Sequence, residues 1–343
     1  MIRDDAVDIL SNLIDGQYTS VQIHDVLDSW VCYRQFYQRK KSGAKRLLSA
    51  PDDSLKKLQY YILRYILYRF PVHKNLYGFV PGVTMKDGVY THLLNQHTRD
   101  GGMPRWILHI DLKNCFPSVK SEILQNMFED MSAGLLYEYG VHNTDVFLEF
   151  CRIMVELTTY KGRLTQGAPT SPYLTNLVIS WSGIADNLDA YCRENKLHFS
   201  IYADDIVVSS VNHEQISKRQ IIKCVEANKI FRVNPKKTHL NNVRHRSHCI
   251  TGIIVHTPIV GVDKCARLTL SQKKQKFYRG RIWYATRFLQ QGYEPSIQND
   301  GISVEQVRGY IAWIRHVCGG HIPSSLQKPI SYFEKITATL NDI

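Results

Sequence analysis

The sequence predicts an α+β fold, because strand-like and helix-like segments follow one another without an internal repeat. Residues 106–111 (WILHID) form an apolar run that ends in a carboxylate, which is typical of a buried strand. Residues 199–210 hold two β-branched, apolar stretches on either side of Asp204-Asp205, which indicates a hairpin. Residues 120–160 and 174–194 indicate helices instead.

The N-terminal part predicts helices on either side of a basic hairpin. The first ~30 residues indicate one or two short amphipathic helices. The stretch 37–46 (YQRKKSGAKR) predicts a hairpin that turns at Ser42-Gly43. Asp53 or Ser54 can cap the helix that follows. The apolar face of that helix consists of Leu55, Leu58, Ile62, Tyr65 and Ile66.

The middle of the chain predicts a loop, a helix and two short strands. Glycine and proline are frequent in residues 162–172, which predicts a loop that leads into the helix over 174–194. A further helix is expected over 214–229. Short strands are expected around Arg232-Val233 and over 250–255.

The C-terminal part, from residue 265 on, is basic and predicts helices. Ser303 and Gln306 have the spacing of a capping box for a helix over 304–317. Gly319-Gly320 then ends that helix. The whole chain of 343 residues is long enough for two or three subdomains with their own cores.

The composition indicates what kind of partner the protein binds and in which cellular compartment it works. The formal net charge is +12, and a basic surface of this size favours a polyanion such as nucleic acid. Eight cysteines are scattered without Cys-x-x-Cys spacing, which argues against a structural zinc site and indicates reduced, buried thiols. Neither an apolar run of about 18 residues nor a signal pattern is present, so we expect a soluble cytoplasmic protein with no membrane partner.

Asp204 and Asp205 are the strongest candidates for chemistry. Aspartate is a poor strand residue, so two of them between strands accept a local cost. That cost is explained if the carboxylates hold Mg²⁺, which binds one or two carboxylates together with phosphate oxygens. Asp111, at the end of the other strand, is the natural partner of Asp204. The alternatives are an ordinary Asp-Asp turn and, for Asp111, a helix cap.

Five ordered motifs resemble those of reverse transcriptases. Residues 110–118 (IDLKNCFPS) are similar to the first palm motif, 166–177 (QGAPTSPYLTNL) to the central motif and 202–205 (YADD) to the catalytic hairpin. Asn234–Thr238 (NPKKT) and Ile250–Gly252 (ITG) are similar to the motifs that follow. A four-residue match recurs by chance, whereas five matches in the family's order do not. With the basic segment 40–51, the resemblance covers roughly residues 35–255.

This resemblance implies a right-hand polymerase fold and an RNA-directed DNA polymerase that uses two Mg²⁺ ions, with Mn²⁺ as a possible substitute. Residues 1–105 would then form N-terminal helices and fingers, 106–260 the palm with part of the fingers, and 261–343 a helical thumb. It implies that Asp111, Leu112, Asp204 and Asp205 hold the metals. Lys237, or its neighbour Lys236, would protonate the leaving pyrophosphate.

The resemblance also assigns residues to the incoming nucleotide. Phe116 would act as a steric gate against a 2′-hydroxyl group, although it also fits as a core residue. Arg46, with Lys45, Lys40 and Lys41, would face the triphosphate, unless these side chains form a solvated hairpin. The remaining residues of the nucleotide pocket would be Gln166, Gly167 and Tyr202.

The C-terminal region interleaves cations with aromatic residues, which is typical of a nucleic-acid contact. An amphipathic helical layer with a solvated face is the alternative. The cations concerned are Lys273, Lys274, Lys276, Arg279 and Arg281.

Within the family, the chain is most similar to bacterial retron reverse transcriptases. It departs from them at Thr91–His97, where Asn-Ala-x-x-His is usual, and His92 and His97 are expected to be structural or RNA-facing. The likeness implies a structured non-coding RNA as template and primer, dNTPs as substrates, a branched RNA-linked DNA product and an effector protein in antiphage defence. The alternatives are a non-retron defence reverse transcriptase, template-independent or protein-primed, and a catalytically idle RNA-binding scaffold. An RNA-dependent RNA polymerase would carry Gly-Asp-Asp.

Overall fold

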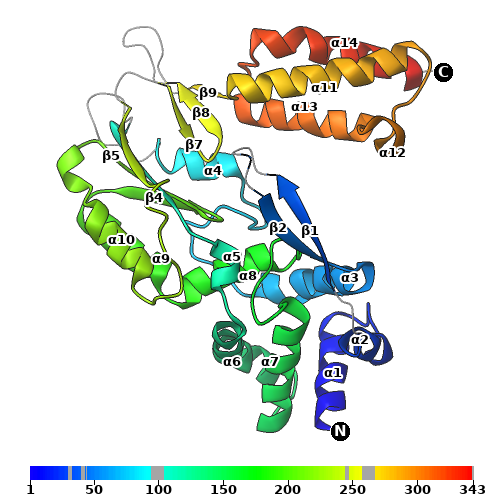
Figure 1. The fold of residues 1–343 in the computed structure, drawn as a ribbon, viewed down its shortest axis with the longest axis vertical. Coiled ribbons are helices and arrows are strands. Elements are labelled where there is room, and N and C mark those ends of the chain that lie inside the picture. Colours follow the sequence, from blue (N-terminus) through cyan, green and yellow to red (C-terminus); the bar gives the residue numbers. More distant parts are fainter. Residues whose placement is uncertain are drawn as a thin grey trace. The chain divides into compact units, whose positions relative to one another are not determined.

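The computed structural model describes residues 1–29, 33–39, 43, 45–93, 104–243, 247–256 and 267–341. It combines helices with small sheets, so the predicted α+β class is confirmed (Figure 1). The chain forms two compact units. Unit 1 consists of Met1–Gly88 and Leu108–Leu240, and unit 2 consists of Val89–Ile107 and Asn241–Ile343.

Two short helices begin unit 1, as predicted. These are α1 (Ile2–Leu13) and α2 (Ser20–Leu27). Thr19 and Gln22 form a capping box at the start of α2, because each side chain accepts a hydrogen bond from the other residue's backbone N–H. The buried face of α1 packs against α7 (Thr144–Thr158).

The predicted basic hairpin is present. Strands β1 (Tyr33–Arg39) and β2 (Lys45–Pro51) pair in antiparallel register, with Arg39 opposite Lys45. The expected turn residue Ser42, together with Lys40 and Lys41, lies outside the described residues. Every residue of β1 after Tyr33 is exposed, whereas β2 becomes buried toward Pro51.

The helix after the hairpin begins one residue earlier than predicted. Asp52, rather than Asp53 or Ser54, is the cap, since its carboxylate accepts a hydrogen bond from the Leu55 N–H at 2.8 Å. Helix α3 (Asp53–Tyr61) continues into a π-helical turn over Ile62–Ile66 and a 3₁₀ turn over Leu67–Arg69. Of its predicted apolar face, all but Tyr65 is buried: Leu55, Leu58, Ile62 and Ile66.

Four longer helices follow in unit 1. The helical region 120–160 is confirmed as α6 (Ser121–Glu138) and α7. The single helix expected over 174–194 is wrong, because the chain forms α8 (Ser171–Trp181) and α9 (Ile184–Glu194). Gly183 separates them with φ +74°, a left-handed conformation that interrupts the helix and that glycine adopts readily.

Helix α10 (Lys218–Glu226) is shorter than the helix predicted over 214–229. Its first part is replaced by a separate 3₁₀ turn over His213–Gln215. At the far end Lys229 takes a left-handed conformation with φ +57°, which an α-helix does not accommodate. The periodicity therefore identified the helix but not where it starts and stops.

A four-stranded sheet lies in the strand order β4-β5-β3-β6. Strands β4 (His198–Tyr202) and β5 (Asp205–Ser210) form the predicted antiparallel hairpin, and α9 packs against β4. Strand β3 (Trp106–Asp111) has the predicted bounds. The fourth strand is β6 (His239–Asn242), and short helices α4 (Met85–Tyr90) and α5 (Cys115–Ser118) flank β3 in the sequence.

Unit 2 contains a small sheet in the order β7-β8-β9. Strands β7 (His248–Ile250) and β8 (Ile253–His256) confirm the strand expected over 250–255 and show that it is a hairpin. Strand β9 (Arg267–Thr269) was not predicted. Arg232-Val233 forms only an isolated bridge, between Val233 and Leu112 in unit 1.

The helices of unit 2 are α11 (Gln272–Gln290), α12 (Ile297–Asp300), α13 (Val304–Cys318) and α14 (Ser324–Asn341). The Ser303–Gln306 capping box of α13 is confirmed. Helix α11 packs against α13 and α14. Among the helices that the structure describes, none offers a stretch long and apolar enough to cross a bilayer.

Among the described cysteines, free thiols are found, as predicted, at Cys115, Cys151, Cys192 and Cys224. Cys249 is exposed and Cys224 is half-buried, so burial of all cysteines was wrong. The buried ones are Cys115, Cys151, Cys192 and Cys318.

Candidate active site

The β4–β5 hairpin carries the predicted acidic pair at its turn. Tyr202 and Asp205 are the last paired residues, so Ala203 and Asp204 form the turn itself. Ala203 has φ +55°, a left-handed conformation that reverses the chain within two residues. The apolar side chains of both strands are buried in the core, whereas Asp204 at the turn is exposed.

Strand β3 brings Asp111 to the same place. The backbone N–H of Leu112 donates a hydrogen bond to the carbonyl oxygen of Asp204 at 2.8 Å. On the other side, the carbonyl oxygen of Asp111 accepts a hydrogen bond from the Asn234 N–H at 2.8 Å. Two carboxylates far apart in the sequence are thus held beside each other by backbone hydrogen bonds rather than by flexible side chains.

Cationic and polar groups surround the Asp111 carboxylate. Lys237 Nζ lies 2.6 Å from Asp111 Oδ1, and Asn234 Nδ2 donates to Asp111 Oδ2 at 3.1 Å. Asp205 Oδ1 lies 4.0 Å from His109 Nδ1. The Asn-Pro-Lys-Lys-Thr segment therefore supplies both an amide and an ammonium group to the same carboxylate.

Desolvation and repulsion among the carboxylates both act on the pKa of Asp204. Partial desolvation raises the pKa of Asp204, and the nearby Asp111 and Asp205 raise it further, while Lys237 acts in the opposite direction. Burial, then Asp204 and Asp111, also raise the pKa of the Cys115 thiol. Cys115 therefore stays protonated at neutral pH and acts as an apolar neighbour of the site, because a thiol is a poor nucleophile.

The donor set fits Mg²⁺. Within the described residues no group of three or more His, Cys, Asp or Glu side chains converges as a closed metal cage. Mg²⁺ does not require one, since it is commonly bound by one or two carboxylates while phosphates and water complete the shell. The mutual repulsion of Asp111, Asp204 and Asp205 is relieved when a divalent cation lies among them.

The hairpin β1–β2 is joined to the Gln166-Gly167 loop. The Ser49 N–H donates to the Gln166 carbonyl oxygen at 2.9 Å, and the Thr165 hydroxyl donates to the Ser49 carbonyl oxygen at 3.1 Å. Gly167 has φ +127°, and a Cβ atom there would lie 2.9 Å from the Ser49 carbonyl oxygen. Only glycine fits this close approach between two backbones.

The other predicted nucleotide-binding residues are positioned as follows. Lys45 and Arg46 are exposed on β2, and Lys45 Nζ lies 5.8 Å from the centre of the Tyr37 ring. Phe116 lies in α5, five residues after Asp111, and is half-buried, as is Tyr202. The structure thus brings together Asp111, Asp204 and Lys237, and separately joins β2 to Gln166-Gly167.

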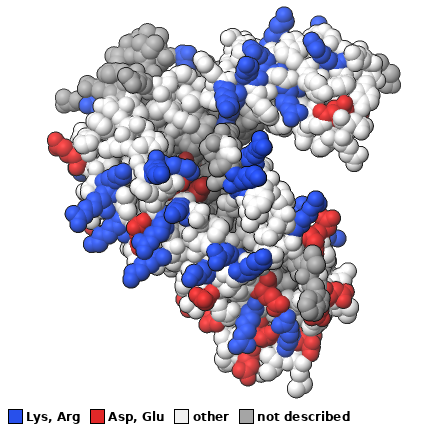
Figure 2. Space-filling model, viewed as in Figure 1, with Lys and Arg blue, Asp and Glu red and all other residues white. Residues whose placement is uncertain are grey.

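The predicted nucleic-acid-binding cations all lie on α11 of unit 2, where Lys and Arg side chains gather at the surface (Figure 2). Lys273, Lys276 and Arg279 are exposed. Lys274 instead donates from Nζ to the Gly252 carbonyl oxygen at 3.0 Å. Arg281 donates to the Gly301 carbonyl oxygen at 3.1 Å. The last two side chains therefore have structural contacts within unit 2.

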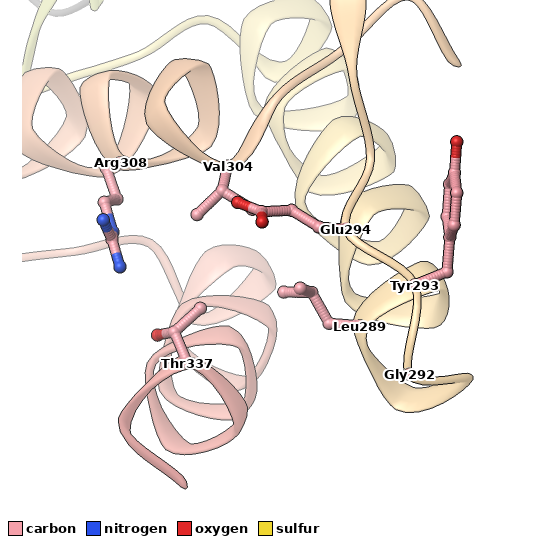
Figure 3. Close-up of a pocket in the computed structure, with 7 residues that line it drawn as sticks. All are labelled: Leu289, Gly292, Tyr293, Glu294, Val304, Arg308 and Thr337. Atoms are coloured by element: carbon pink, nitrogen blue, oxygen red, sulfur yellow. The ribbon is translucent and has the colours of Figure 1, made fainter. Parts of the chain in front are cut away.

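His92 is buried, with 0% of its surface exposed, and His97 lies outside the described residues. Unit 2 contains a cavity of about 320 Å³ among residues of α11, α13 and α14 (Figure 3). Glu294 and Arg308 are its charged lining residues, and none of the predicted site residues is part of it. It is therefore not assigned to the chemistry of Asp111 and Asp204.

Sequence reasoning missed the segment 73–80, which lies along β4. The Tyr77 N–H donates to the Ile201 carbonyl oxygen at 2.9 Å, and the Ile201 N–H donates to the Asn75 carbonyl oxygen at 2.8 Å. Leu76 and Ile201 form a parallel bridge. The signal that could have identified it is Tyr77-Gly78-Phe79, where a glycine between two aromatic residues indicates a close backbone approach.

A sheet that presents carboxylates from neighbouring strands, next to an ammonium group, defines a candidate site for nucleotidyl transfer. The family model described as "Reverse transcriptase (RNA-dependent DNA polymerase)" matches residues 38–280, more than half of the chain. The chain belongs to this family, as the sequence motifs predicted.

The curated relatives include retron enzymes, which confirms the predicted retron-type resemblance. Retron Mx65 reverse transcriptase of Myxococcus xanthus is 29% identical over 238 residues, covering 66% of this chain and 52% of that protein. Retron Ec86 reverse transcriptase of Escherichia coli is 25% identical over 307 residues, covering 89% and 81%. The chain thus spans about half the length of the Mx65 relative.

Solved structures support the fold. Apo telomerase from Candida tropicalis has a TM-score of 0.50 and 12% identity, and the match covers 88% of this chain and 59% of that chain. Telomerase from the same organism in complex with a TWJ fragment of telomeric RNA also has a TM-score of 0.50, at 13% identity, covering 90% and 55%. At this identity the likeness shows the polymerase-type fold alone.

Proposed function

We propose that this protein is an RNA-directed DNA polymerase that works by two-metal nucleotidyl transfer. The observation that carries the proposal is the backbone hydrogen bond between Leu112 and Asp204, which holds two catalytic-type carboxylates side by side in a member of the reverse transcriptase family. A buried β-scaffold that fixes carboxylates in this way suits a reaction in which positioning and electrostatics supply most of the rate.

Asp111 and Asp204 would hold Mg²⁺, with Asp205 and the backbone carbonyl of Leu112 as further oxygen donors. When bound, the ions would activate the primer 3′-hydroxyl and neutralise charge on the phosphates. The raised pKa of Asp204 supports this role, because a crowded carboxylate gains most from a cation. Lys237 neutralises Asp111 at 2.6 Å and would turn to the pyrophosphate, to which it can give a proton.

The incoming dNTP would bind between β2 and the loop it touches. Arg46 and Lys45 would contact the triphosphate, and Gln166, Gly167 and Tyr202 would complete the pocket. The Ser49–Gln166 hydrogen bond supports this arrangement, since it joins the cationic strand to the loop. Phe116, half-buried in the short helix after Asp111, would exclude a 2′-hydroxyl group.

We further propose the division into fingers (1–105), palm (106–260) and thumb (261–343). Helix α11 would contact the template–primer duplex in the thumb. Its exposed Lys273, Lys276 and Arg279 are available for phosphates, while Lys274 and Arg281 would contribute less because each is bonded within unit 2. Aromatic rings at Phe277 and Tyr284, exposed by 50% and 45%, add stacking surfaces.

The retron-type resemblance favours a dedicated structured RNA as template and primer, with a branched, RNA-linked single-stranded DNA as product. A separate effector protein in antiphage defence is part of the same proposal. The free thiols at Cys115, Cys151, Cys192 and Cys224 are consistent with action in the cytoplasm. The similarity to the retron Mx65 and Ec86 enzymes carries this assignment.

The deciding experiment is to purify the protein from cells that carry its native locus and to analyse the bound nucleic acid after separate RNase and DNase treatment. A discrete DNA that shortens slightly with RNase is the expected result. Free heterogeneous DNA, or a strand linked to protein, would contradict the retron assignment and favour another defence reverse transcriptase. RNA without DNA would contradict polymerase activity and favour an RNA-binding scaffold.

A further inference from the structure

Phe79 combines two properties that folding alone does not explain. Its φ angle is +59°, a left-handed conformation that is unfavourable for a bulky side chain. Its side chain is also 50% exposed, so little burial compensates for the backbone conformation. Such a combination is typical of residues that are held in place for binding or catalysis.

The neighbouring Gly78 shows what holds Phe79. A Cβ atom on Gly78 would lie 2.8 Å from the Ala203 backbone nitrogen, so the two backbones are in direct contact. Asn176, fully buried in α8, donates from Nδ2 to the Gly78 carbonyl oxygen at 2.6 Å. The chain at 78–79 is therefore fixed between α8 and the turn that carries Asp204.

This arrangement places the Phe79 ring beside Tyr202. The two ring centroids are 5.9 Å apart, with the planes tilted by 39°. Tyr202 precedes the turn by one residue, and Asp204 follows two residues later. The two rings form an aromatic surface, of which the Phe79 part is exposed, at the edge of the candidate metal site.

We propose that Phe79 contacts the terminal base pair of the primer–template duplex and fixes the primer 3′-end beside Asp204. This inference rests on the proposed polymerase function and adds a primer-contacting residue to it. Every nucleobase has an apolar face that stacks on aromatic rings, so the contact suits a primer end of any sequence. The rigid attachment of residues 78–79 to the Asp204 turn sets the distance between that end and the carboxylate.

The test uses a DNA primer annealed to a synthetic RNA template, with 2-aminopurine as the primer's 3′-terminal base. Binding of the wild-type protein should change the 2-aminopurine fluorescence. Phe79→Gly and Phe79→Asn should abolish that change and raise the KM for primer–template about tenfold, the scale of one stacking contact. Phe79→Trp should retain both properties.

Stability separates this role from a structural one. Because glycine and asparagine tolerate a left-handed backbone, both variants should keep or raise the melting temperature. Tyr137→Ala is the matched control: it removes a ring on α6 that is 68% exposed and should change neither fluorescence nor KM.

Two results would overturn the inference. The first is that wild-type protein binds the primer–template without changing the 2-aminopurine fluorescence. The second is that Phe79→Gly shows the same fluorescence change and the same KM for primer–template as the wild type. The proposed function fails separately, if the wild type extends no primer on RNA. If the wild type extends the primer and Phe79→Gly behaves identically, the proposed polymerase function stands and only the proposed contact of Phe79 with the primer is rejected.

Discussion

The two hairpins of unit 1 have the same topology and opposite surroundings. Hairpin β4–β5 is buried along its strands and presents carboxylates, whereas β1–β2 is mostly exposed and presents cations. A buried hairpin holds its turn in one place, which metal ligands require. An isolated two-stranded ribbon is marginal in water, so β1–β2 depends on whatever it touches.

Strand β2 packs against α3 and is hydrogen-bonded to the Gln166-Gly167 loop. The hydrogen bonds of Ser49 to Gln166 and of Thr165 to Ser49 give the exposed hairpin its defined position at this end. The comparison teaches that the two hairpins are stabilised differently: one by its own core, the other by a loop that is itself part of the candidate nucleotide pocket. Substitutions should therefore affect them in different ways.

Asp204→Asn breaks the acidic hairpin's chemistry and should have the largest effect. Removing one of the proposed metal-binding carboxylates should reduce DNA synthesis by about 10³-fold or more, while the fold is retained. Primer extension on an RNA template, with circular dichroism as the check on folding, measures both. Asp145→Asn, at an exposed site in the first turn of α7, is the control and should leave activity unchanged. Activity near wild type in Asp204→Asn would contradict the metal site.

Gly167→Ala should disturb the contact between the Gln166-Gly167 loop and Ser49, which positions the basic hairpin β1–β2. The new Cβ would lie 2.9 Å from the Ser49 carbonyl oxygen, at a φ of +127° that alanine avoids. We expect β2 to shift and kcat/KM for dNTPs to fall by about 10- to 100-fold, the scale of such strain. Gly134→Ala on α6, where nothing lies within 4 Å, is the control and should be neutral or slightly stabilising. Equal kcat/KM for dNTPs in both variants would show that the contact between Gly167 and Ser49 does not affect nucleotide use.

The two hairpins also show what the sequence could predict. Both were identified, because β-branched, apolar stretches and the Ser-Gly turn are local signals. The pairing of Asp111 with Asp204 was inferred because Asp111 ends an apolar strand, and the backbone hydrogen bond at Leu112 agrees with it. The segment 73–80 was missed because Tyr77-Gly78-Phe79 indicates a close backbone approach without indicating its partner. That partner, Ala203, lies 125 residues after Gly78 in the sequence.

Helix ends show the same limit. The capping box at Ser303 is entirely local and was predicted correctly. The break at Gly183 was missed, because isolated glycines are tolerated within helices. Whether the helix continues or breaks there depends on the packing of α8 and α9. Lys274 was expected to meet nucleic acid, and its bond to Gly252 depends on the tertiary position of the β7–β8 turn.

Arg46→Gln sharpens the comparison within the basic hairpin. Loss of a charge-assisted contact to the triphosphate should raise the KM for dNTPs about tenfold with little change in kcat. Arg219→Gln is the matched control, because Arg219 is an exposed arginine on α10, which contributes no residue to the proposed nucleotide pocket. Steady-state kinetics with a single dNTP measure the difference. An equal increase in both variants would mean a general charge effect rather than a specific contact.

The smallest expected effect is on stability, and it concerns the acidic hairpin. The native pKa of Asp204 is raised from 3.8, so the native state binds this proton more tightly than the unfolded state. As pH rises from 3.8 through the raised native pKa, Asp204 therefore removes stability, and the full penalty persists at neutral pH. Asp204→Asn has no such penalty.

In EDTA at neutral pH, Asp204→Asn should therefore melt higher than the wild type, by ~1–3 °C. The difference should shrink as the pH is lowered to below 3.8, where the wild-type carboxyl is protonated in both states. Added Mg²⁺ should raise the melting temperature of the wild type more than that of the variant, because the proposed site binds the ion through the native carboxylates. Differential scanning fluorimetry across pH measures all three effects. A variant that melts below the wild type in EDTA would mean that Asp204 stabilises the turn, and that the hairpin's strands do not hold it unaided.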